Sequence, residues 1–242
     1  GMSLTVLSRR QPDDEPRHAA LSRLGASVEV LPTVREIDPW SALFCRDAER
    51  TGLFESLGDV VRRFAAYGHP RMPSLVAEAL YLRGRLAELG IAHVHTHFAT
   101  DSAIVACLVA ALGGASYSLT LHAKDIYRSG VDPALLDRLI GDSAFSVTVC
   151  DANVRQLRSV VGERAASRLR RLYNGIELSA WYDHTEQRDR DHVLAVGRLV
   201  EKENGKLEAK RYGGGRAGRG ALIGGALGLV GAAFTGGLSI LA

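Results

Sequence analysis

Three histidines alternate with other residues along one short stretch of the sequence. His93, His95 and His97 lie two positions apart, and residues with this spacing point to the same side of a regular β-strand. Three imidazoles on one side can bind a metal ion, with His122 and Asp125 as the nearest further ligands, as in metal-dependent hydrolases. The same histidines can instead be structural, or can hydrogen-bond a substrate as neutral imidazoles.

A second group of polar residues follows the next apolar stretch. His122, Lys124 and Asp125 come directly after the run that ends at Leu121. An imidazole, an ammonium group and a carboxylate so close together can hydrogen-bond hydroxyl groups and neutralise a phosphate. We predict that His122 is functional, whereas Lys124 and Asp125 either contact the ligand or form a solvated turn.

The residues after His97 predict a passage from a strand into a helix. Phe98 is followed by Thr100 and Asp101, either of which can serve as the N-cap. The free N–H groups and the dipole of such a helix N-terminus favour an anionic ligand. The alternative is that the cap only begins the helix and binds nothing.

Short apolar runs alternate with longer stretches of helical period along the chain. This alternation is typical of βαβ units, and it predicts an α/β fold with a Rossmann-like, doubly wound parallel sheet. Ligands of that class bind beyond the carboxyl ends of the strands, where His97 and His122 are expected. The predicted strands are 4–8, 28–31, 92–97, 117–122, 145–150, 170–173 and 193–197. The predicted helices are 17–24, 39–67, 73–89, 102–112, 133–140 and 153–161, with a break at 68–70.

The charged residues are unevenly distributed. The 242 residues carry a net charge of +3, but residues 206–242 hold five basic residues and one acidic residue. The rest of the chain therefore has a net charge of −1. A nearly neutral domain gives no reason to expect a nucleic-acid partner.

The C-terminal tail is rich in glycine. Residues 213–219 have the composition of a flexible cationic linker, and residues 221–242 contain no charged residue. An apolar segment of this length can span a membrane, with the basic residues before it on the cytoplasmic side. The alternative is an aberrant or disordered terminus.

The cysteines and the N-terminal residues predict a cytoplasmic protein. Cys45, Cys107 and Cys150 are far apart and have no metal-binding spacing, so we expect reduced thiols. The first ten residues contain no long apolar region of the kind that a signal peptide requires.

Five stretches of the sequence, taken together and in this order, resemble a known family. They are HVHTHFATDSA, LTLHAKDIY, VTVCDANVRQL, LYNGIELSAWY and LAVGRLVEK. They are similar to the acceptor-side half of family 4 glycosyltransferases, which are bacterial enzymes of the GT-B fold, over about residues 1–202. The resemblance implies two Rossmann-like domains around a cleft and transfer of a sugar, with retention, from a nucleotide-sugar to a carbohydrate or lipid-linked acceptor. It implies no cofactor and no obligatory metal.

The resemblance also implies roles on the acceptor side. His122 matches the catalytic histidine that reaches the transferred sugar. His97 and Phe98 match the wall of the acceptor site, which Lys124 and Asp125 are expected to complete.

Further roles concern the donor side and the hinge. Asn174 and Gly175 match the turn that leads out of the first domain. Arg198 matches the arginine that binds the donor diphosphate, and Lys202 is the nearest match to its partner lysine. That lysine directly precedes a glycine in the family, whereas Lys202 is followed by Glu203, so the match at Lys202 is displaced.

The resemblance predicts the domain organisation. Residues 1–190 form the acceptor-side domain, residues 191–205 the first strand of a donor-binding domain, and residues 206–242 the tail. Family members have a further strand, a glycine-containing loop and a helix before the segment that matches residues 1–7. We therefore expect little activity from this chain alone. The alternative is a non-catalytic acceptor-binding remnant, or one tethered to the inner face of the membrane.

Overall fold

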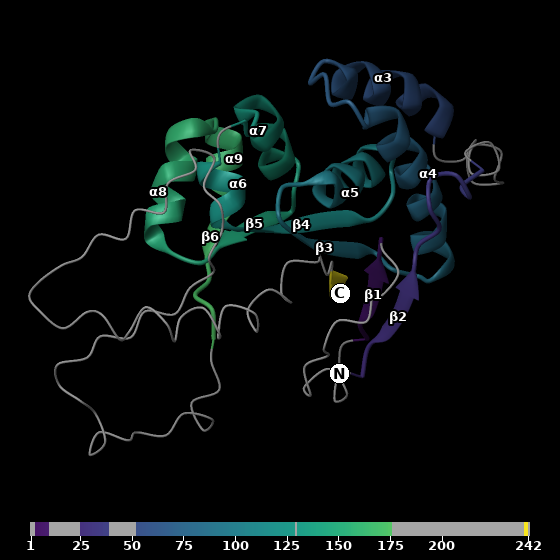
Figure 1. Cartoon of the computed structure of the whole chain (residues 1–242), viewed down its shortest axis with the longest axis horizontal. Coiled ribbons are helices and arrows are strands. Elements are labelled where there is room, and N and C mark those ends of the chain that lie inside the picture. The colour runs from purple at the N-terminus through teal and green to yellow at the C-terminus, as the bar shows by residue number, and fades with distance from the viewer. Residues whose placement is uncertain (1–2, 10–24, 39–51, 129, 176–239, 242) are drawn as a thin grey trace, which may run out of the picture. The chain divides into compact units, whose positions relative to one another are not determined.

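A computed structural model describes residues 3–9, 25–38, 52–128, 130–175 and 240–241 (Figure 1). These residues belong to one compact unit of the chain, while a second unit, formed by 13–18 and 176–236, lies outside the described residues. Parallel strands and helices alternate along the described unit, so the predicted α/β fold class is confirmed.

The strands form two sheets rather than the single sheet that we expected. One has the order β2-β1-β7 and the other the order β3-β4-β5-β6. Neighbouring strands are parallel except for β7, which is antiparallel to β1. The strands are β1 (Thr5–Ser8), β2 (Ser27–Val30), β3 (His93–His97), β4 (Ser116–Leu121), β5 (Phe145–Thr148), β6 (Leu169–Arg171) and β7 (Ile240–Leu241).

The predicted strands agree with these bounds closely, with two informative differences. The strands predicted to end at His122 and Cys150 end earlier, because both residues are N-caps of the helices that follow. Strand β7 was not predicted, since it lies in the glycine-rich tail. The predicted strand 193–197 lies outside the described residues.

The described helices confirm most of the helical predictions. The helix predicted at 39–67 is described only from residue 52 onward, and the one predicted at 17–24 lies outside the described residues. Helices α6 and α9 were missed because they span little more than one turn. The helices are α3 (Leu53–Ala65), α4 (Met72–Glu88), α5 (Asp101–Ala111), α6 (Ala123–Tyr127), α7 (Pro133–Gly141), α8 (Asp151–Val160) and α9 (Glu163–Arg168).

Local signals in the sequence explain where several helices begin and end. Gly68 adopts a left-handed φ of 61° between α3 and α4, a conformation that glycine reaches without strain. Helix α7 begins at Asp132, whose side chain accepts a hydrogen bond of 2.9 Å from the N–H of Ala134, and Pro133 follows in the first turn. This is the usual chemistry of a helix N-terminus.

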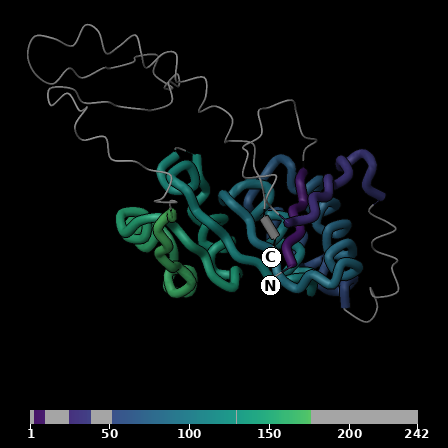
Figure 2. Tube along the Cα trace, turned by 90° about the horizontal axis from the view of Figure 1, so that it is seen from below, coloured from purple at the N-terminus to yellow at the C-terminus, as the bar shows by residue number. Residues whose placement is uncertain are grey.

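The Cα trace in Figure 2 follows the alternation of strands and helices from the purple strand β1 to the green strand β6.

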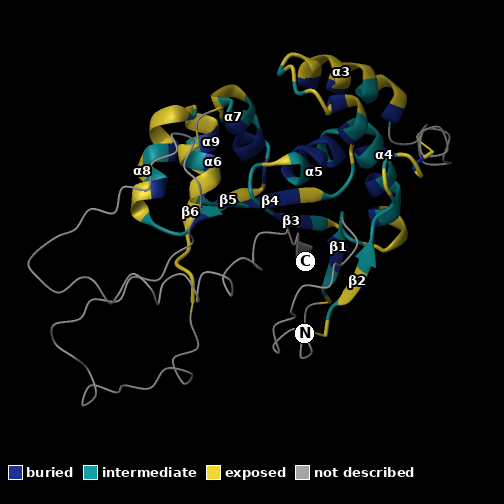
Figure 3. Ribbon diagram, in the orientation of Figure 1, coloured by how far each residue is buried: buried dark blue, intermediate teal, exposed yellow. Residues whose placement is uncertain are grey.

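The core lies on one side of the strands and is centred on α5. Every residue from Ala103 to Val109 is buried, because α5 contacts β3, β4, α3, α4 and α7. A helix that is apolar all round requires burial on all sides. Figure 3 shows the buried residues gathered on α5 and on the strands. Leu7 from β1 and Val94 from β3 belong to the same apolar cluster, so the two sheets share one core.

The sequence predictions for a membrane concern residues that are almost all undescribed. Within the described ranges, no helix combines the length and the apolar character needed to cross a bilayer. Of the predicted apolar segment 221–242, only Ile240–Leu241 is described, and it forms strand β7.

Candidate functional site

The carboxyl ends of β3 and β4 bring three predicted site residues together. The two strands are parallel, with His97 opposite Thr120, so they end at the same edge of the sheet. The N–H of Phe98 donates a hydrogen bond of 2.9 Å to the carbonyl oxygen of Thr120. His122 then follows the end of β4 as the N-cap of α6. His97, Phe98 and His122 are therefore neighbours, as the sequence predicted.

Two imidazoles interact directly at this edge. Nδ1 of His97 lies 3.2 Å from Nε2 of His122, and the centroids of the two rings are 5.5 Å apart. We call His97 and His122 the imidazole pair. For this hydrogen bond, one nitrogen must carry a hydrogen and the other must accept it. Both histidines are half-buried, so neither residue is closed off from solvent.

Phe98 is held over the imidazole pair by an unusual backbone conformation. It has a φ of 70° and is the one non-glycine residue with a positive φ among the described residues. A bulky residue in this region is strained, and such strain is found at functional sites. The conformation places the Phe98 ring 4.4 Å from the His122 ring, centroid to centroid. The pair therefore has an aromatic wall.

The Asp125 side chain is buried and faces the backbone of His122. Its side chain is buried, with the residue 4% exposed, and Oδ2 accepts a hydrogen bond of 2.9 Å from the N–H of His122. The two residues form a capping box at the start of α6. Burial raises the pKa of the Asp125 carboxyl, while hydrogen bonds from the N–H groups of His122 and Ala99 oppose that rise.

These bonds make Asp125 a positioning residue for His122. They join the first turn of α6 to the segment that follows β3. The buried carboxylate faces the N–H groups of His122 and Ala99 rather than solvent. Lys124, next to it, is exposed and remains accessible to a ligand.

The other two histidines of β3 are engaged by hydroxyl groups of β4. His93 contacts Ser116 and Ser118 through Nδ1 and Nε2, at 2.8 Å each. His95 contacts Ser118 at 2.7 Å and Thr120 at 2.8 Å in the same manner. We call these five residues the histidine–hydroxyl row. Both nitrogens of each ring are used, which assigns His93 and His95 a structural role.

The row borders the imidazole pair, and the charge of His97 influences the protonation of His95. The rings of His95 and His97 meet edge to face, with centroids 5.3 Å apart. Burial, followed by the charges of His97 and His93, lowers the pKa of His95 to about 4. Burial and then His122 lower the pKa of His97, and burial lowers that of His93. These rings are therefore neutral near pH 7, and each can both donate and accept a hydrogen bond.

The alternative of a metal site on the histidines of β3 is not supported by the described residues. Among the residues that the structure describes, no group of three His, Cys, Asp or Glu side chains could hold a metal ion. The physical reason is that His93 and His95 direct their nitrogens at hydroxyl groups of the neighbouring strand.

The N-terminus of α5 is already supplied with a negative charge. Asp101 is its first residue and forms ion pairs with Arg71 and, at 3.9 Å, with Arg9. Thr100 is the N-cap, but its side chain makes no capping hydrogen bond. An anionic ligand here would meet the Asp101 carboxylate, which favours the interpretation that this cap only begins the helix.

The same edge contains residues that the sequence did not single out. Arg171, after β5 and within β6, donates a hydrogen bond of 2.9 Å to Asp151 and another of 2.9 Å to the Tyr173 hydroxyl. Its guanidinium carbon lies 4.5 Å from the centroid of the Tyr173 ring. The sequence shows the aromatic Tyr173 shortly after the residues of β6. Asp151, the hydrogen-bond partner of Arg171, lies 20 positions away from it. Spacing alone could not pair them.

The remaining predicted residues are only partly described. Asn174 and Gly175 are exposed and end the described segment after β6. Arg198 and Lys202 lie outside the described residues, so their donor-binding role stays a prediction.

The arrangement can bind a polyhydroxylated ligand. Neutral imidazoles suit hydroxyl groups, and the face of an aromatic ring suits the apolar side of a sugar.

Comparison of the chain with models of protein families, with curated proteins and with solved structures found no match.

Proposed function

We propose that this chain is the acceptor-side part of a family 4 glycosyltransferase. Such an enzyme transfers a sugar from a nucleotide-sugar to an acceptor hydroxyl with retention of configuration. The observation that supports the proposal most is the imidazole pair. His97 and His122 lie 3.2 Å apart, at the carboxyl ends of adjacent parallel strands, which is where this fold class binds ligands.

Each residue of the site has a role in this proposal. His122 hydrogen-bonds the transferred sugar near the reacting centre, and His97 orients His122 through the bond between their rings. Phe98 packs against the apolar face of the acceptor, and the exposed Lys124 adds a positive charge at the rim. Because burial and His122 lower the pKa of His97, the His97 ring is neutral near pH 7 and orients hydroxyl groups rather than neutralising a phosphate.

The donor side of the proposal depends on residues outside the described ranges. Arg198 and Lys202 would bind the diphosphate and stabilise its negative charge as the leaving group departs. The acceptor is a carbohydrate or a lipid-linked carbohydrate. We place the reaction in the cytoplasm, at the inner face of the membrane, with neither a metal nor a nucleic acid required.

The proposal can be tested by following the ring signals of the histidines by NMR. The chain is titrated with monosaccharides and with a panel of UDP- and GDP-sugars. We expect shifts that are confined to His97, Phe98 and His122, and we expect His122→Ala to abolish them. His93→Ala is the matched control, because His93 lies on the same strand at the end away from the pair, and it should leave binding unchanged.

The outcomes separate the proposal from its competitors. Release of nucleotide from one donor in the presence of an acceptor, lost in His122→Ala, identifies a transferase. Sugar binding without nucleotide release is expected both of a glycosyltransferase part with little activity alone and of a non-catalytic acceptor-binding domain. Calorimetry with nucleotide-sugars separates these two, because the non-catalytic domain should have no nucleotide affinity. Sugar-dependent shifts that survive His122→Ala would place the site elsewhere and overturn the proposal.

A further inference from the structure

The two sheets share a core but are not hydrogen-bonded to each other. β1 pairs with β2 along one edge, and β3 pairs with β4 along one edge. Leu7 of β1 and Val94 of β3 nevertheless belong to one apolar cluster with residues of α4 and α5. Because β1 and β3 contribute to one core but do not pair with each other, a gap lies between them. If they paired, the two sheets would form one continuous sheet.

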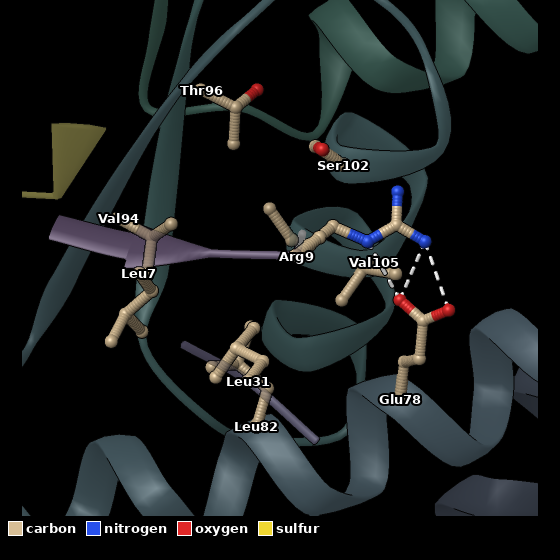
Figure 4. A pocket seen from close by; sticks show the side chains of 10 residues that line it. Leu7, Arg9, Leu31, Glu78, Leu82, Val94, Thr96, Ser102 and Val105 are labelled. Carbon is tan, nitrogen blue, oxygen red and sulfur yellow. Dashed lines mark hydrogen bonds and ion pairs between the residues drawn. The ribbon is translucent and has the colours of Figure 1, made fainter. Parts of the chain in front are cut away.

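A cavity lies in this gap (Figure 4). Its walls are apolar and come from both sheets and both helices, including Leu7, Val94, Leu82 and Val105. At its rim, Arg9 donates hydrogen bonds of 2.8 and 2.9 Å to the carboxylate of Glu78. The lining therefore suits an apolar side chain rather than a charged molecule.

One polar group in the cavity has no partner. Thr96, on β3, is 2% exposed, and its hydroxyl oxygen is the single buried side-chain oxygen or nitrogen without a hydrogen bond among the described residues. A buried hydroxyl without a partner is costly. Thr96 therefore leaves one unpaired polar group in the otherwise apolar lining of the gap.

The described end of the tail already lies in this gap. Ile240–Leu241, strand β7, pairs antiparallel with Thr5 and Val6 of β1 and also contacts β3. In Figure 4 this strand is the yellow ribbon beside Val94 and Leu7. β7 covers only the first half of β1, and the cavity lies next to the second half, at Leu7 and Arg9.

We propose that the gap between β1 and β3 is a strand-binding site, and that its occupant is strand β7 of this same chain. Addition of a strand to an exposed sheet edge satisfies backbone groups that would otherwise remain unpaired. β7 acts as a strap between the two sheets: it pairs with β1 through main-chain hydrogen bonds and contacts β3. This inference concerns the sheet edge and does not depend on the proposed glycosyltransferase function.

Hydrogen exchange tests the strap. Backbone amide exchange is measured in the full chain and in a variant that lacks residues 240–242. We expect the amides of β1 to exchange faster by about tenfold or more in the shortened chain, while those of β4, which pairs with β3 and β5, stay unchanged. A peptide with the sequence Gly-Gly-Leu-Ser-Ile-Leu-Ala, added to the shortened chain, should restore the protection of β1.

Two substitutions keep the test valid if the shortened chain fails to fold. Ile240→Pro removes a main-chain N–H of β7 and fixes φ at about −65°, away from the values of a β-strand, so it should reproduce the faster exchange of β1. Ala242→Pro, just beyond β7, is the matched control and should not. Equal exchange of β1 in the full chain and in Ile240→Pro would overturn the proposal. Restoration by a scrambled peptide as well as by the native one would overturn the choice of occupant.

Discussion

The two buried threonines of the sheets differ in the hydrogen-bond partners of their hydroxyl groups, and the contribution of each hydroxyl to stability depends on those partners. Thr96 has no partner for its Oγ1, whereas Thr148 donates a hydrogen bond of 3.1 Å to the carbonyl oxygen of Leu121 and accepts one of 3.0 Å from Asn153. Both are buried, at 2% and 0% exposed. The same substitution should therefore have opposite effects at the two positions.

We expect Thr96→Val to raise the free energy of unfolding by about 1 kcal/mol, because it removes an unpaired polar group. Thr148→Val should lower it by about 1–3 kcal/mol, because Asn153 loses its acceptor. Urea unfolding followed by circular dichroism measures both values. A loss of stability in Thr96→Val would mean that its hydroxyl has a partner in solution.

The histidine–hydroxyl row predicts how stability depends on pH. The pKa of His95 falls to about 4 in the folded chain, below the value of about 6.5 for a histidine in an unfolded chain. Between these two values the unfolded state binds more protons than the folded state, so stability falls as the pH is lowered. The lowered pKa values of His93 and His97 act in the same direction.

We therefore expect the free energy of unfolding to decrease from about pH 6.5 toward pH 4, by an amount on the order of 1–2 kcal/mol for a half-exposed ring. His95→Gln should reduce this dependence, since glutamine does not titrate. Unfolding curves at several pH values give the slope for both proteins. An unchanged slope in His95→Gln would assign the dependence to other groups.

At the scale of elements, the short helix α6 positions His122. Five residues cannot form a stable helix by themselves, so α6 depends on its capping box and on the bonds of the Asp125 carboxylate. These bonds join α6 to the end of β3, and in that way they set the distance between His97 and His122.

Asp125→Ala should lower the free energy of unfolding by about 1–3 kcal/mol, because two buried N–H groups lose their acceptor. It should also shift the NMR signal of the His122 ring. Asp132→Ala is the control: it removes the cap of α7, costs about 1 kcal/mol, and leaves His122 unchanged. A normal His122 signal in Asp125→Ala would contradict the positioning role.

At the scale of the whole described unit, the sequence predicted the order of elements but not their assembly into sheets. Each strand from β1 to β6 overlaps a predicted strand, because the sequence patterns that indicate a strand extend over only a few residues. The division into two sheets was not, because it depends on which strands pair at their edges. Strand β7 is the extreme case, since its partner β1 lies at the other end of the chain.

The site was predictable to the same degree. His97, Phe98 and His122 each end or follow an apolar run, and the rule that parallel strands end at one edge brought them together. The roles of His93, His95 and Asp125 were not predictable. The hydrogen-bond partners of their side chains depend on the register of β3 against β4 and on N–H groups of another segment. The spacing of residues in the sequence does not reveal these partners.

The sequence by itself therefore determined the α/β class, the positions of the elements and the residues at the carboxyl edge of the sheet. These properties follow from hydrophobic period and from turn chemistry, which act over a few residues. Only the tertiary structure decided that two imidazoles bond to each other, that Asp125 is buried behind them, and that a gap separates β1 from β3. Those outcomes depend on strand register and side-chain direction, which are set by contacts between residues far apart in the chain.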